Sequence, residues 1–133
     1  MTRARDAEAT RAHAAALAAE LPPGAIVYVE GPLGAGKTTF VQGACRALGV
    51  QERVTSPTYT VAHLYDGRVA HLDLSRASSL DDEAWGDLEP YFEDVRAAFI
   101  EWPEVGRGQL PPATLVVRIT PLDDGTREIE RIS

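Results

Sequence analysis

The sequence has one cysteine, one methionine and few aromatic residues, which make up 7% of its 133 residues. The lone Cys45 excludes an internal disulfide and fits a reducing compartment. No apolar stretch approaches the ~20 residues of a membrane-spanning helix. The charged, alanine-rich N-terminus also lacks the apolar core of a signal peptide. We therefore expect a cytoplasmic protein that does not enter a membrane.

Positive charge is scarce as well. The 13 lysines and arginines are outnumbered by 20 acidic residues, which gives a net charge of −7. This balance argues against phosphate-driven binding of nucleic acid over a broad surface, although it leaves room for a local basic patch. The length and the hydrophobic fraction of 44% are typical of one globular domain, here residues 1–133.

One run, residues 31–38 (GPLGAGKT), has every fixed position of the phosphate-binding loop G-x-x-x-x-G-K-[ST]. Its glycines let successive backbone N–H groups point at phosphate oxygens. Lys37 can reach the β- and γ-phosphates, and the hydroxyl of Thr38 can bind Mg²⁺. A chance match in a glycine-rich turn is the alternative reading. The sequence therefore predicts a nucleoside triphosphate site.

The flanking residues strengthen this interpretation. Residues 25–30 (AIVYVE) are apolar and β-branched, as in a buried strand. Residues 39–48 indicate a helix that stops at Gly49. The order strand, loop, helix is the one that a phosphate-binding loop requires.

The rest of the chain predicts an α/β fold: a single P-loop NTPase domain with a mixed sheet, flanking helices and a C-terminal antiparallel hairpin. We expect helical segments at 6–21, 79–85 and 88–94. A loop leads into a strand within 54–65, and further strands are expected at 69–74, 97–102, 115–119 and 127–132. Asp66-Gly67 and Asp124-Gly125 are hairpin turn signals.

Two apolar strands carry a carboxylate at or near their ends, Asp73 and Glu101. Ligands of α/β sheets gather beyond these strand ends, where a carboxylate can hold Mg²⁺ or orient water. A plain surface carboxylate is the alternative. His71, on a buried strand, is expected to be a hydrogen-bonded core histidine, and Trp102 to pack in the core or beside the nucleotide. Residues 56–60 (SPTYT) suit either a nucleotide-sensing loop or a simple proline turn.

Four blocks occur in a specific order: GPLGAGKTTF at 31–40, VTSPTYT at 54–60, HLDLSR at 71–76 and IEWP at 100–103. Together they resemble the TsaE (YjeE) family of small bacterial P-loop ATPases, over about residues 6–132. The resemblance implies ATP and Mg²⁺ as cofactors and a weak ATPase that works with the TsaB–TsaD complex. That machinery puts threonylcarbamoyl on the adenosine beside the tRNA anticodon. An acidic ATPase would reach tRNA only through these partners.

The resemblance also implies roles for individual residues. Lys37, Asp73 and Glu101 would be catalytic, with Thr38 and Glu101 as metal ligands. Nucleotide contacts would come from Thr10, Gly34, Ala35, Gly36, Lys37, Thr38, Thr39 and Trp102. Ser56–Thr60 would be the family's switch segment.

The sequence departs from the family pattern at three places. Ser75 stands where a tyrosine is usual, Pro32 stands where aspartate is usual, and the N-terminus is too short for the family's first strand. Arg76 is the nearest candidate for an arginine finger, although its direction cannot be read from the sequence. Whether Arg76 or Arg127 contacts the nucleotide is left open by the sequence.

Two rival classes share the same loop. A small-molecule kinase would need an acceptor pocket and usually a lid, and the sequence has no evident lid insertion. A nucleotide-dependent adaptor would bind without hydrolysis. Metal-dependent phosphate release, with and without partners, separates the three classes.

Overall fold

A computed structural model describes residues 2–54, 62–75 and 81–132. Seven strands form one sheet in the order β1-β7-β6-β2-β5-β4-β3. Strands β2, β4, β5 and β6 run parallel, whereas β3, β7 and β1 are added by antiparallel pairing. The strand bounds are β1 Thr2–Ala4, β2 Ala25–Glu30, β3 Ala62–Tyr65, β4 Val69–Asp73, β5 Ala97–Glu101, β6 Leu115–Pro121 and β7 Arg127–Arg131.

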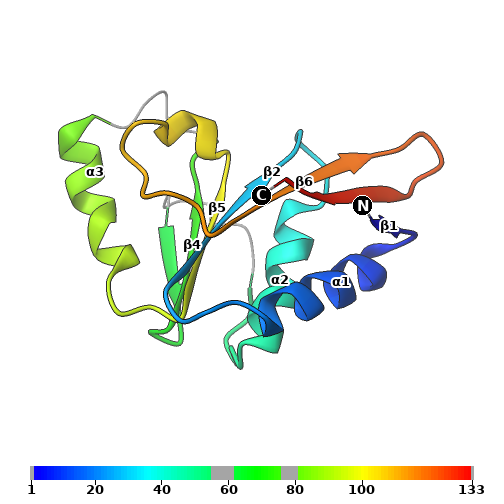
Figure 1. Ribbon diagram of the computed structural model, residues 1–133, viewed down its shortest axis with the longest axis horizontal. Helices are drawn as coiled ribbons and strands as arrows, with labels where there is room; N and C mark the ends of the chain where they lie inside the picture. The colour runs from blue at the N-terminus through cyan, green and yellow to red at the C-terminus, as the bar shows by residue number, and fades with distance from the viewer. Residues whose placement is uncertain (1, 55–61, 76–80, 133) are drawn as a thin grey trace.

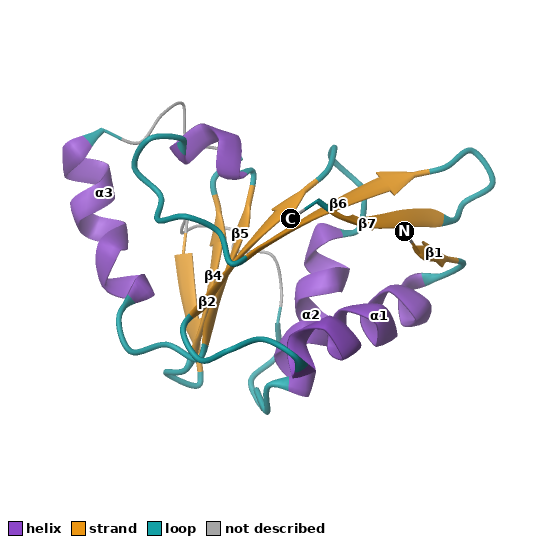
Figure 2. Ribbon diagram, in the orientation of Figure 1, coloured by secondary structure: helices purple, strands orange, loops and turns teal. Residues whose placement is uncertain are grey.

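Helices cover both faces of the sheet (Figures 1 and 2). Helices α1 (Ala7–Ala19) and α2 (Lys37–Ala47) lie on one side, and α3 (Asp82–Leu88) lies on the other. The alternation of side chains along a strand explains this layering. In β2, Val27 and Val29 belong to the core under α1 and α2, whereas Ile26 and Tyr28 pack against the core on the side of α3. None of the described helices has the length and apolar character needed to cross a bilayer.

Helices α1 and α2 pack unusually closely. A Cβ atom placed on Gly43 of α2 would lie 2.3 Å from the backbone oxygen of Arg11 in α1. Only glycine allows the two backbones to approach this far. Asp6 caps α1 by accepting a 2.8 Å hydrogen bond from the amide of Ala9. These contacts fix α2, which carries the phosphate-binding loop at its N-terminus.

Most of the expected elements are confirmed, including the central strand Ala25–Glu30, the turn before β4 and the C-terminal hairpin of β6 and β7. The expectation of a missing first strand is wrong. Residues Thr2–Ala4 form β1 and pair with β7, because three extended residues suffice to add a strand to an open sheet edge.

Other corrections concern element ends. The strand expected to include Trp102 ends at Glu101, because Trp102 has a positive φ of 59°. The helical segments expected at 79–85 and 88–94 are α3 followed by a single 3₁₀ turn, Glu89–Phe92. Asp81 sets the start of α3 by capping the amide of Ala84.

Candidate nucleotide site

The loop between β2 and α2 adopts a backbone conformation with positive φ angles, which glycine allows. Gly31, Gly34 and Gly36 all have positive φ values, of 153°, 79° and 97°. A side chain on Gly31 would meet the carbonyl oxygen of Ile119 at 2.6 Å. Gly36 begins α2 without a side-chain cap, so the first amides of this helix remain available to an anion.

Lys37 lies at the centre of the loop and is only 5% exposed. Its ammonium group donates to the carbonyls of Gly31 and Pro32 at 2.7 and 2.8 Å, and it lies 4.5 Å from the ring centre of Trp102. An ammonium has three donors, which leaves one for a phosphate oxygen. Burial lowers the pKa of Lys37, and the nearby carboxylates of Glu101, Asp73 and Glu104 oppose that shift.

The two predicted carboxylates meet at one edge of the sheet. Strands β4 and β5 are parallel neighbours, and Asp73 lies opposite Glu101 in their register. Oδ1 of Asp73 accepts a 3.0 Å hydrogen bond from the backbone amide of Ser75, which orients the carboxylate at the end of the strand. The register thus places both carboxylates beside the phosphate-binding loop, and both line the same pocket.

A chain of buried hydrogen bonds holds Glu101. Its Oε2 atom lies 2.6 Å from Nε2 of His71 and 3.2 Å from the hydroxyl of Thr38. The hydroxyl of Tyr65 lies 3.1 Å from Nδ1 of His71, whose ring is fully buried. His71 is thus the hydrogen-bonded core histidine that the sequence predicts. Its partner, however, is the proposed metal ligand, so it orients that carboxylate.

The donor set fits Mg²⁺. The hydroxyl of Thr38 and the carboxylate of Glu101 are hard oxygen donors 3.2 Å apart. Adjacent ligands of octahedral Mg²⁺ lie about 3 Å from each other. Among the described residues, no group of three or more His, Cys, Asp or Glu side chains could hold a metal. The remaining ligands would be phosphate and water oxygens, as is usual for Mg²⁺ bound with a nucleotide, with the carboxylate of Asp73 as a further candidate.

These side chains line a pocket of about 370 Å³. Of the residues predicted from the sequence, the pocket brings together Gly34, Gly36, Lys37, Thr38, Thr39, Asp73, Glu101 and Trp102. Ala35, within the loop, is fully buried and does not line the pocket. Thr10 lines a smaller neighbouring cavity of about 80 Å³ that shares Gly36, Thr39 and Arg127 with the main pocket. Ser56–Thr60 and Arg76 lie outside the described residues.

Arg127, for which the sequence leaves a contact with the nucleotide open, lines the pocket. From the start of β7, its guanidinium donates to the carbonyls of Ala35 at 2.9 Å and Gly34 at 3.4 Å. The C-terminal hairpin thereby supports the phosphate-binding loop. No local pattern marks this contact, because it depends on where β6 places β7 beside a loop some ninety residues earlier in the chain.

Comparisons with known proteins agree on one family. The family description that matches, over residues 4–129, is "Threonylcarbamoyl adenosine biosynthesis protein TsaE". The chain is 39% identical to a Treponema pallidum protein named tRNA threonylcarbamoyladenosine biosynthesis protein TsaE, over 82% of each chain. It is 36% identical to the Bacillus subtilis protein of that name, over 92% of this chain and 78% of the relative. The solved structure of Bacillus subtilis YdiB superposes with a TM-score of 0.80 at 32% identity, covering 98% of this chain and 82% of that one.

Proposed function

Because the chain belongs to the TsaE family of threonylcarbamoyladenosine biosynthesis proteins, we propose that it is the ATP-binding and ATP-hydrolysing component of the tRNA modification machinery. In this proposal residues 1–133 act as one P-loop ATPase domain in the cytoplasm. The chain works with the TsaB–TsaD heterodimer on the adenosine beside the anticodon and reaches tRNA only through that complex.

One observation carries the proposal: the loop lysine, the loop threonine and the two strand-end carboxylates face a single pocket. The loop amides and Lys37 would hold the β- and γ-phosphates. Thr38 and Glu101 would bind the metal, and Asp73 would bind it or orient the attacking water. Bound Mg²⁺ would neutralise charge on the phosphates. Trp102 and Thr10 would contact the nucleoside.

Partner activation is part of the proposal. The guanidinium of Arg127 is aimed at loop carbonyls, and Arg76, the arginine-finger candidate named from the sequence, lies outside the described residues. We propose that the partner completes or orders the site, by supplying a further cation over the γ-phosphate or by holding Ser56–Thr60. Supplying such a charge raises the rate of P-loop enzymes by about 10³–10⁵. We expect the isolated chain to hydrolyse ATP slowly.

The test is Mg²⁺-dependent phosphate release from ATP, measured with and without purified TsaB–TsaD. We expect a steep rise when the heterodimer is added. Thr58→Ala, in the predicted switch segment, should reduce that rise more than it changes ATP affinity. Equal turnover with and without the heterodimer would reject partner activation. Phosphate transfer to an added small-molecule acceptor would favour the kinase alternative.

A further inference from the structure

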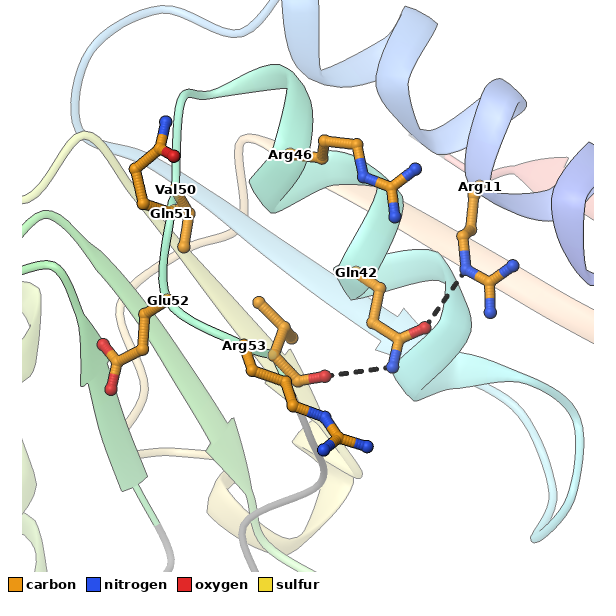
Figure 3. A pocket seen from close by; sticks show the side chains of 8 residues that line it. Arg11, Gln42, Arg46, Val50, Gln51, Glu52 and Arg53 are labelled. Atoms are coloured by element: carbon orange, nitrogen blue, oxygen red, sulfur yellow. Dashed lines mark hydrogen bonds between the residues drawn. The ribbon is translucent and has the colours of Figure 1, made fainter.

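A second pocket, of about 320 Å³, lies away from the nucleotide site and is lined by three arginines. Arg11 comes from α1, Arg46 from the last turn of α2, and Arg53 from the segment that follows α2 (Figure 3). Three elements thus bring guanidinium groups to one concave surface of a chain whose net charge is −7. The pocket is therefore locally positive, whereas the net charge of the whole chain is negative.

Part of the pocket wall is held in place by hydrogen bonds. Gln42 accepts from Nε of Arg11 at 3.2 Å and donates to the carbonyl of Val54 at 3.0 Å (Figure 3). Gln42 thereby links α1, α2 and the segment after α2. The adjacent Gly43 keeps the two helices in close contact. The guanidinium of Arg11 is therefore positioned by the fold.

The charges of these arginines are poorly compensated. The carboxylate of Glu52 points away from them and instead binds His63 at 2.9 Å and the amide of Asp66 at 3.0 Å. Arg11 pairs with the exposed Glu8. Within the described part of the chain, no ion pair or side-chain hydrogen bond involves Arg46 or Arg53, and both are exposed. The pocket therefore has guanidinium groups available to an anionic ligand.

The ligand's chemistry follows from the pocket lining. Guanidinium groups bind carboxylates and phosphates by paired hydrogen bonds. None of the described residues that line this pocket is aromatic, so these residues offer no stacking platform for an RNA base. An RNA helix carries closely spaced phosphate charges along its whole length, and these would meet the acidic remainder of the surface. A short acidic protein segment carries only a few charges, which suits a pocket of this size.

We propose that this arginine pocket docks an acidic segment of a partner protein. The proposal deepens the proposed function, on which it rests for the existence of a partner. Gln42 lies one turn after Thr38 on the same face of α2, so a segment bound there would contact the helix that carries Lys37 and Thr38. Docking at the arginine pocket can thereby influence the nucleotide site through a single element.

The first test uses a peptide of six glutamates and an RNA hairpin, each titrated into the chain while the arginine Nε–H signals are followed by NMR. We expect the peptide to shift the signals of Arg46 and Arg53. The double variant R46E/R53E should lose the response of the remaining Arg11 signal. No shift with the peptide, or a shift of the same signals by the hairpin at lower concentration, overturns the proposal.

The second test measures binding to purified TsaB–TsaD by calorimetry. R46E/R53E should weaken binding by about tenfold or more, because charge-assisted contacts become repulsive. The matched control R131E, which reverses an exposed charge on β7, should change it by less than about twofold. Unchanged ATP affinity and melting temperature confirm that each variant is folded.

The two proposals fail separately. If the wild-type chain does not bind TsaB–TsaD, the partner named in the proposed function is wrong. The peptide titration alone then decides whether the arginine pocket binds acidic segments. If the wild type binds and R46E/R53E binds equally well, the docking proposal is overturned while the proposed function stands.

Discussion

At the scale of the residue, Lys37 stabilises the loop and also lines the pocket. Its ammonium group donates hydrogen bonds to two carbonyls of the loop and faces the pocket. We predict that Lys37→Ala weakens ATP binding by about 10- to 100-fold, since a charge-assisted hydrogen bond contributes about 1.5–3 kcal/mol. Titration with a fluorescent ATP analogue measures this. Arg107→Ala, which removes an exposed charge, is the control. Equal affinities of wild type and Lys37→Ala would contradict the assigned role.

Glu101 is buried and hydrogen-bonded, so its exchange for glutamine keeps the shape of the site while removing the charge. We predict that Glu101→Gln raises the Mg²⁺ concentration needed for half-maximal nucleotide binding, with less effect on binding in EDTA. His71→Leu should act in the same direction, because loss of a group that orients a metal ligand lowers metal affinity by about 10- to 100-fold.

The control for this comparison is Glu104→Gln. Glu104 is exposed and close enough to influence Lys37, but it is not among the residues that line the pocket. Superimposable Mg²⁺ titrations for wild type and Glu101→Gln would show that Glu101 is not a ligand.

At the scale of the element, the contact between α1 and α2 depends on Gly43. We predict that Gly43→Ala lowers the free energy of unfolding by about 1–3 kcal/mol, because the new methyl group meets rigid backbone of α1. Urea unfolding measures the change. Gly86→Ala is the matched control: Gly86 lies in α3 with nothing within 4 Å of an added Cβ. That variant should gain about 0.5–1 kcal/mol from helix propensity, and a similar loss in both variants would reject the packing argument.

Elements with a local signal could be predicted closely. The bounds of β2 follow from a buried β-branched run between Gly24 and the loop. Strand β1 has no such signal, because three residues carry no periodicity and their conformation comes from pairing with β7. The residue pattern extends β5 by one residue, to Trp102, because a left-handed φ at a tryptophan leaves no mark in the pattern of apolar residues.

At the scale of the whole molecule, the site too contains residues that the sequence could indicate and residues that it could not. Lys37 and Thr38 lie in a contiguous motif, and Asp73 and Glu101 end apolar strands, so the sequence could indicate all four. Arg127 could be named only as an open candidate beside Arg76, since its contact with the loop depends on the position of a strand far away in the chain. The arginine pocket is also assembled from three separate segments, and the net charge of −7 conceals it.

The buried thiol predicts how stability depends on pH. Burial, aided by the negative charge of Asp66, raises the pKa of Cys45 from 9.0 to about 12. Between these values the native chain keeps a proton that the unfolded chain releases, so the free energy of unfolding falls as pH rises through this window. Urea unfolding at a series of pH values measures the slope. Cys45→Ala should show a shallower decline, and identical slopes would contradict the shift.

The order of strands has a consequence for synthesis on the ribosome. The first strand of the chain pairs with the last, and β6 completes the other side of β2 only after more than 110 residues have been made. The phosphate-binding loop emerges early, but the guanidinium that braces it, from Arg127, is made some ninety residues later. A nascent chain therefore carries the motif long before it has the finished site. Firm binding of a nucleotide would therefore have to wait until β7 has been synthesised and has paired with β6.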